Sequence, residues 1–217
     1  MAKEKTQEIV VKEIKVEHAV ITIEGKTDLV LNKMNASNSR QLIADDRKAQ
    51  GLWEAQHKNK WEDIITSIHW RDGIPVNDTN SECNEELFYT MLRENAPCIS
   101  AFGLKKSWGQ AVVRQEIDKY STKFDSAVNI CANGGLIPIK FAEWKLDERL
   151  MAPKRGAPIA TRLNHFVGWI AEIPIEFTTN VYSINEIMTI VNYAGFSIGI
   201  GSGRTSGYGR YSIINVK

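Results

Sequence analysis

Apolar and polar side chains alternate along residues 167–177, which is the clearest pattern in the chain. A two-residue period is typical of a strand with one buried face, so we expect a half-buried strand here. Pro174 lacks a backbone N–H, which predicts that this strand lies at a sheet edge or contains a bulge. The apolar positions are Val167, Trp169, Ala171, Ile173, Ile175 and Phe177.

The residues after this strand predict a capped helix, a loop and a final strand. Ser183 and Glu186 have the spacing of a capping box, in which each side chain bonds the backbone N–H of the other residue. Apolar residues follow a helical period over 184–194, and Gly195 is expected to end the helix in the left-handed conformation. A glycine-rich stretch then leads to a short strand over 211–216. The apolar helix positions are Ile184, Ile187, Met188 and Val191.

Patterns in the first part of the chain are weaker. Residues 9–23 are rich in Ile and Val, but the apolar face changes parity near Glu17, which predicts one long strand or two, with a bulge there. Residues 25–28 read as a turn, after which 29–31 extends the pairing. The pattern of 61–70 fits a helix or a strand.

Helical periodicity returns before a long irregular region. We expect a weakly amphipathic helix over 39–50, a polar loop over 51–62 and a helix over 85–95. The apolar stripe of that last helix is Leu87, Phe88, Met91 and Leu92. Residues 98–165 are the least regular, and we interpret them as an insertion carried by the core domain. Its expected elements are a helix that begins near Lys105 and runs to Tyr120, a strand over 136–141 and an exposed basic turn over 153–158.

Charge is unevenly distributed, although the net charge of the 217-residue chain is only +1. Eleven basic and six acidic side chains lie between Lys105 and Arg162, which gives that stretch a charge of +5. No acidic residue follows Glu186, whereas Arg204 and Arg210 do. This asymmetry fits a polyanionic partner, and it equally fits a solvated basic face.

Three cysteines, Cys83, Cys98 and Cys131, are too widely spaced for a zinc site, and we expect buried free thiols in a reducing cytoplasm. No cofactor or metal site is expected. Residues 1–5 are charged and do not resemble a signal peptide. The chain lacks an apolar run of about 18 residues, so we expect no membrane span and a place in the host cytoplasm.

Five glycines within 199–209 require a physical reason, because glycine loses the most backbone entropy on folding. The usual reasons are positive φ at several positions or close approach of the main chain to a ligand. No Lys-Ser or Lys-Thr pair follows, which excludes a P-loop, and the helix precedes the loop, which excludes a dinucleotide fingerprint. A Gly/Arg loop that leads into a strand fits a phosphodiester chain, with Arg204 and Arg210 on phosphates and Tyr208 stacked on a base. The alternative is a glycine-rich hairpin with surface arginines. The predicted binding residues are Gly199, Gly201, Gly203, Arg204, Gly207, Tyr208, Gly209 and Arg210, with Lys105, Lys106, Lys154 and Arg155 from the basic stretch.

The segment 198–213 resembles the signature glycine-rich loop of the RAMP superfamily, whose members bind or process guide RNA in CRISPR systems. The resemblance implies an α+β, ferredoxin-like (RRM/RAMP-like) fold, with an antiparallel sheet, two helices and a large insertion. Residues 9–23 would be its first strand and 85–95 its first helix. The chain would then be a single domain, 1–217, with the insertion at about 98–165.

The whole chain also resembles uncharacterised proteins of phages and prophages of Gram-positive bacteria, and no activity comes with that resemblance. The segments that carry it are 96–98, 120–125 and 134–140.

Nuclease members of the superfamily use a histidine base, for which His18, His57 and His69 are candidates here. Asp45 and Asp46 resemble the loop aspartate that some backbone subunits use for metal-dependent cleavage. His18 lies in a strand and reads as structural, and nothing positions a partner for His57 in its polar loop. Asp45 and Asp46 read as surface residues of a charged helix, so we expect a protein without catalytic residues that binds single-stranded RNA or DNA.

Three alternatives remain open at this point. They are a metal-independent RNA endonuclease, a phage inhibitor that mimics a host RAMP subunit and binds protein, and a virion structural protein. We also expect homo-oligomers along the strand, with Trp108 and Trp144 of the insertion as contact surface.

Overall fold

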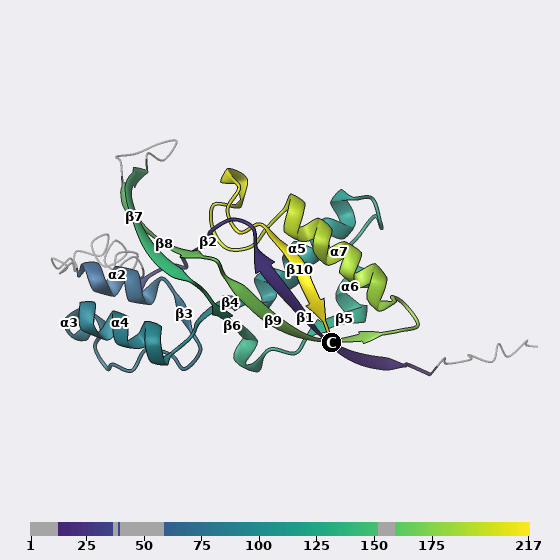
Figure 1. Ribbon diagram of the computed structural model, residues 1–217, viewed down its shortest axis with the longest axis horizontal. Coiled ribbons are helices and arrows are strands. Elements are labelled where there is room, and N and C mark those ends of the chain that lie inside the picture. Colours follow the sequence, from purple (N-terminus) through teal and green to yellow (C-terminus); the bar gives the residue numbers. More distant parts are fainter. Residues whose placement is uncertain (1–12, 37–38, 40–58, 152–158) are drawn as a thin grey trace, which may run out of the picture.

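The computed structural model describes residues 13–36, 39, 59–151 and 159–217, which form an α+β fold (Figure 1). The strands are β1 (Val16–Gly25), β2 (Leu29–Leu31), β3 (His69–Trp70), β4 (Pro97–Ser100), β5 (Val128–Ile130), β6 (Leu136–Lys140), β7 (Glu143–Met151), β8 (Ile159–Val167), β9 (Ile170–Thr178) and β10 (Tyr211–Val216). The helices are α2 (Lys60–Thr66), α3 (Thr79–Glu82), α4 (Glu85–Glu94), α5 (Ala101–Arg114), α6 (Thr122–Ala127) and α7 (Ile184–Ser197), with short 3-10 turns η1 (Asn133–Gly135) and η2 (Arg204–Ser206).

Antiparallel pairing builds two sheets within the described residues. The larger has seven strands in the order β10-β1-β9-β6-β4-β3, with β5 also paired to β9. The smaller has the order β2-β8-β7, and its long β7–β8 hairpin extends away from the main sheet (Figure 1).

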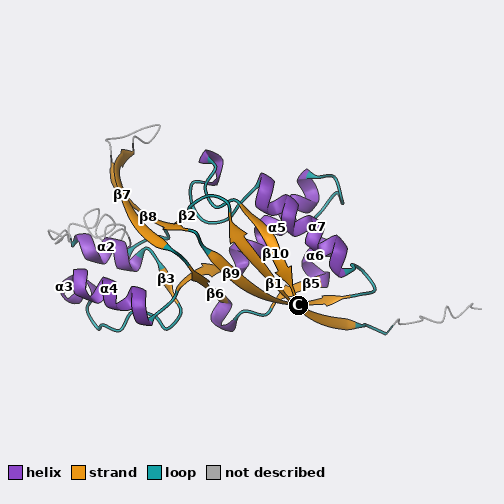
Figure 2. Ribbon diagram, in the orientation of Figure 1, coloured by secondary structure: helices purple, strands orange, loops and turns teal. Residues whose placement is uncertain are grey.

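Four strands of the main sheet and two helices form the expected ferredoxin-like core. The strand order β10-β1-β9-β5 is antiparallel throughout, and α5 packs against α7, which in turn contacts β10 (Figure 2). In chain order the core reads β1, α5, β5, β9, α7 and β10. The α+β, antiparallel, ferredoxin-like expectation is therefore confirmed: β1, β9 and β10, the strands expected at 9–23, 167–177 and 211–216, lie in one sheet, although Val167 belongs to β8 of the smaller sheet.

The first helix of this core differs from the expected one. The helix over 85–95 forms as α4, but α5 is the helix that packs against α7. Both α5 and β5 lie inside 98–165, so that range contributes to the core as well as to the additional strands β6, β7 and β8. A second long connection, between β1 and α5, carries β2, α2, β3, α3, α4 and β4.

Strand β9 is central, and the prediction of an edge strand was wrong. Its full length pairs with β1, while β5 and β6 share its other side. Pro174 lies between the stretches that pair with β5 and β6, where the ladder is interrupted and no N–H is needed. Its carbonyl still accepts a bond from Cys131 N at 2.8 Å. The five apolar positions from Trp169 to Phe177 are buried, as the alternation predicted.

Two other local features lie elsewhere than expected. The bulge in β1 falls between Thr22 and Ile23, opposite β10, and pairing with β9 runs regularly through Glu17. The capping box of Ser183 and Glu186 is present, but Gly195 lies inside α7 rather than at its end. A Cβ on Gly195 would collide with the Tyr211 backbone of β10, so this glycine allows helix and strand to approach closely.

Residues 61–70 contain both a helix and a strand, since α2 ends at Thr66 and β3 follows. The polar loop expected over 51–62 is helical from Lys60, because the Asn59 side chain accepts a bond from Trp61 N at 2.9 Å and caps α2. Except for Ser39, the helix expected over 39–50 lies outside the described residues, as do 51–58.

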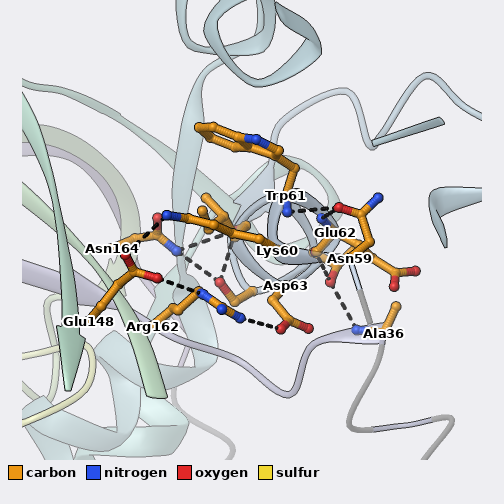
Figure 3. A network of polar contacts seen from close by, with 12 residues as sticks. Ala36, Asn59, Lys60, Trp61, Glu62, Asp63, Glu148, Arg162 and Asn164 are labelled. Carbon is orange, nitrogen blue, oxygen red and sulfur yellow. Dashed lines mark hydrogen bonds and ion pairs between the residues drawn. The ribbon is translucent and has the colours of Figure 1, made fainter. Parts of the chain in front are cut away.

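A polar network attaches α2 to the β7–β8 hairpin (Figure 3). Asn164 of β8 is fully buried, accepts a bond from Trp144 Nε1 at 2.9 Å and donates to Ser67 Oγ at 2.8 Å. At the partly exposed side of the network, Arg162 pairs with Asp63 and Glu148, both at 2.9 Å. The hairpin is therefore held to the rest of the molecule by side chains as well as by its pairing with β2.

Free thiols occur at all three cysteines, but only two of them are buried as expected. Cys83 and Cys98 lie in the interior, where burial raises the pKa of each thiol to about 11. Cys131, which follows the end of β5, is exposed. The prediction of a buried thiol was wrong at this position.

Candidate functional site

The glycine-rich loop leads from α7 to β10, and all five of its glycines have positive φ. Positive φ was one of the two reasons expected for them, and it is confirmed. The other expected reason was close approach to a ligand, but the groups that lie close to these glycines belong to the protein's own backbone. A Cβ on Gly201 would lie 2.5 Å from the carbonyl oxygen of Val30, and one on Gly199 would lie 2.8 Å from that of Gly209.

Backbone hydrogen bonds hold this loop against β2. Ser202 N donates to Val30 O and Gly209 N donates to Asp28 O, both at 2.8 Å. The glycines thus permit a compact loop whose shape is fixed before any ligand arrives.

Two side chains of the loop have partners inside the protein. Arg210 Nη1 donates to the carbonyl of Phe196 at 3.0 Å, which satisfies an acceptor in the last turn of α7. The ring of Tyr208 packs edge-on against His165 of β8, with 5.0 Å between centroids. His165 is buried, and its two ring nitrogens face Asp28 at 3.4 Å and Asp147 at 3.6 Å. Arg210 and Tyr208 therefore join the loop to α7 and to the hairpin.

A cleft of about 230 Å³ lies between the loop, β2, β3 and the start of α5. Three basic side chains line it from three separate segments: Lys33 after β2, Lys106 from α5 and Arg204 from η2. Its polar lining also includes Asn32, His69, Ser100 and Ser202. None of the described residues that line the cleft carries a carboxylate.

The first turn of α5 adds to the positive potential of the cleft. Ser100 Oγ accepts the backbone N–H of Gly103 at 3.3 Å and caps this 14-residue helix. A helix N-terminus carries roughly half a positive charge, and Gly103 lies in the cleft wall. Anions are favoured at such a position.

Burial lowers the pKa of two residues of the cleft. Burial, followed by the neighbouring charge of Lys33, lowers the pKa of His69 below its usual value. Partial desolvation lowers the pKa of Lys33. Only the smaller cause for His69 reports neighbouring positive charge, whereas the Lys33 shift has burial as its sole cause.

Only part of the predicted binding set lines this cleft: Gly201 and Arg204 of the loop, and Lys106. Lys105 points to the other side of α5, where its ammonium donates to Asn129 at 3.1 Å. Lys154 and Arg155 lie outside the described residues, as do His57, Asp45 and Asp46. His18 is exposed on β1.

Sequence reasoning missed Lys33 and Ser100, and it considered His69 only as a candidate base. Lys33 follows a three-residue strand, and Ser100 ends a four-residue strand. The only usable signal was Ser100 as a helix cap, since Ser is preferred at that position.

Among the described residues, no group of three or more His, Cys, Asp or Glu side chains is placed to hold a metal ion. None of the described helices has the length and apolar character that crossing a membrane requires.

No protein-family model and no curated protein matches the chain. Among solved structures, the chain is similar to Cmr6 from Pyrococcus furiosus, with a TM-score of 0.33 and 12% sequence identity, over 93% of this chain and 100% of that one. A likeness this weak does not extend to function, which must come from the cleft residues themselves.

Proposed function

We propose that the protein binds single-stranded nucleic acid, with a backbone phosphate held in the cleft between the glycine loop and α5. The observation that carries this proposal is the convergence of Lys33, Lys106 and Arg204 on a concave surface whose described lining has no carboxylate. Three cations and a helix N-terminus favour a bound anion, and a single strand presents one negative charge at each phosphodiester.

The size of the cleft favours a flexible strand. At about 230 Å³ it is smaller than pockets that enclose drug-sized ligands, and it suits a phosphate with part of its sugar. A single strand can bend to place one phosphate inside, whereas duplex DNA is stiff over about 50 nm. Either RNA or single-stranded DNA satisfies this geometry.

Fluorescence anisotropy with labelled oligo(U), oligo(dT) and a duplex at several salt concentrations tests the proposal. Each phosphate contact in a single strand contributes a slope of about −0.7 in log affinity against log salt. A Lys33→Gln/Lys106→Gln/Arg204→Gln variant should therefore bind more weakly and lose about 0.7 units of slope, since the cleft holds one phosphate. Arg93→Gln is the matched control, since Arg93 is exposed on α4 and does not line the cleft.

Equal affinity and slope in the triple variant and the control would remove the cleft from the binding site. Purified protein that lacks bound nucleic acid and has no affinity for any oligonucleotide would instead favour a protein-binding role. The phage-encoded inhibitor of a host RAMP subunit is that alternative, and purified virions that contain the chain would favour a structural role.

We propose that binding is not accompanied by catalysis, and one observation favours the endonuclease alternative. His69, with its lowered pKa, lies in the same cleft as Lys33, and a neutral imidazole can activate the 2′-hydroxyl of RNA. Incubation of labelled oligo(U) with the protein in the presence of a chelator distinguishes the two. Cleavage that disappears in His69→Ala, and that spares oligo(dT), would establish the endonuclease.

A further inference from the structure

A second hollow lies along the exposed side of α5 and meets the cleft at Lys106, which lines both. Its volume is about 770 Å³, within the range of ligand sites. Phe102, Lys105, Lys106, Val113 and Arg114 line it. Most of these residues are spaced three or four positions apart, so the wall is one continuous face of the helix.

Phe102 is unusually exposed for a large apolar side chain, with 76% of its surface accessible to solvent. Burial of a Phe side chain is favourable, so an exposed ring in a basic groove is apolar surface that folding leaves in contact with water. Aromatic side chains beside basic ones are the combination that holds single strands, with rings stacked on bases and cations on phosphates.

The charges of the groove complement a polyanion. Lys105, Lys106 and Arg114 line it, while Asp125 is the one carboxylate among the described lining residues. Asp125 accepts a bond from Ser121 Oγ at 2.7 Å, so part of its hydrogen-bonding capacity is used inside the protein. Lys105 Nζ donates to Asn129 Oδ1 at 3.1 Å, an uncharged partner.

We infer that the groove along α5 holds the nucleotides next to the phosphate in the cleft, with Phe102 as a stacking platform for a base. This inference rests on the proposed function and extends it from one phosphate to a path. The path runs from Arg204 past Lys106 and Phe102 to Arg114. The 14 residues of α5 rise about 21 Å, which leaves room for several nucleotides.

Phe102→Ala tests the stacking, with Phe196→Ala as the matched control. Phe196 is 83% exposed on α7 but does not line the groove. For an oligonucleotide that accommodates one protein molecule, Phe102→Ala should weaken binding about five- to a hundredfold without changing the salt slope, because stacking releases no counterions. Phe196→Ala should leave the affinity unchanged, and Phe102→Trp should retain it.

The contribution of the basic side chains of the groove can be measured separately from stacking, through the salt dependence of binding. The Lys105→Gln/Arg114→Gln variant should lower the salt slope by up to about 1.4. Its affinity for the shortest oligonucleotides that still bind should be unchanged.

The inference is overturned if Phe102→Ala and Phe196→Ala bind alike, or if Phe102→Ala changes the oligomeric state without oligonucleotide, which would assign the face to a protein contact. Absence of binding by the unmodified protein would overturn the proposed function itself, so the two failures are distinguishable.

Discussion

Gly207 and Gly209 of the glycine-rich loop both have positive φ, but they differ in their surroundings. A Cβ on Gly209 would collide with the backbone carbonyl of Ile200, whereas one on Gly207 would meet nothing within 4 Å. Gly207→Ala should therefore cost only the left-handed strain of about 1–2 kcal/mol. Gly209→Ala should cost at least about 1 kcal/mol more, because the backbone must also shift.

Urea denaturation of both variants, followed by far-UV circular dichroism, measures the difference. If the free energy of unfolding falls equally in both, the loop is not packed as described.

The titration of His69 predicts that binding depends on pH. In the free protein the pKa of His69 lies below its usual value of about 6.5, and a phosphate in the cleft would favour the protonated ring. Binding then takes up a proton, and affinity should rise as pH falls from about 7.5 to about 5.5, by at most about tenfold per unit. His69→Gln should flatten this dependence at constant salt.

The lowered pKa of His69 has the opposite effect on stability, which should fall as pH falls. A lowered folded-state pKa gives stability that is present above about pH 6.5 and lost as pH falls through the folded value. Thermal melts at each pH therefore accompany the binding assay. An unchanged pH profile in His69→Gln would contradict the placement of this ring at the bound phosphate.

At the scale of single residues, sequence predicted what depends on neighbours along the chain. The capping box of Ser183 and the positive φ of the loop glycines are properties of a few consecutive residues. The role of Gly195 was wrong because it depends on Tyr211 of another element. Lys33 and Lys106 are 73 positions apart, and nothing in the intervening sequence indicates that they meet.

At the scale of elements, the hairpin and α2 are joined by two kinds of contact whose strengths should differ. Asn164 is fully buried and bonded to Trp144, Ser67 and the carbonyl of Ile64, whereas Arg162 makes partly exposed ion pairs. Asn164→Ala leaves buried groups without partners and should cost about 2–4 kcal/mol of unfolding free energy. Arg162→Ala should cost about 1 kcal/mol or less.

Chemical denaturation of both variants at low and high salt checks this order. Only the loss in Arg162→Ala should shrink with salt, since screening acts on the ion pairs. A larger loss for Arg162→Ala than for Asn164→Ala would show that the ion pairs, and not the amide, hold the hairpin.

Elements with a strong periodic pattern were predicted, and those defined by pairing partners were not. Helix α7 and strands β9 and β10 have their own local signals, and α4 has an apolar stripe. Strand β5 has three residues, too few for a periodic pattern to be recognised, although it completes the core sheet beside β9. Without β5, α5 could not be recognised as the core helix, and 98–165 looked like an insertion.

At the scale of the whole molecule, the edge of the sheet bears on how copies could assemble. Strand β10 ends the sheet order, and an open edge strand can pair with another chain. Here the Asn192 side chain accepts the backbone N–H of Ile213 at 3.0 Å, which occupies one donor along β10. The tryptophans expected to form a contact are also unsuitable, since Trp108 is fully buried and Trp144 is bonded to Asn164.

We therefore expect homo-oligomers to depend on the nucleic acid and not on strand pairing. One cleft and one groove cover a short stretch of backbone, and neighbours placed side by side on one strand gain cooperativity. Light scattering at micromolar protein should show defined multiples of the 24.5 kDa chain on a long homopolymer, with a binding curve steeper than for independent sites. A repeated head-to-tail contact would close into a ring or continue as a filament, according to its rotation. Oligomerisation is refuted if protein molecules occupy the long strand independently and the protein is also monomeric without nucleic acid. That result would leave the binding proposal intact.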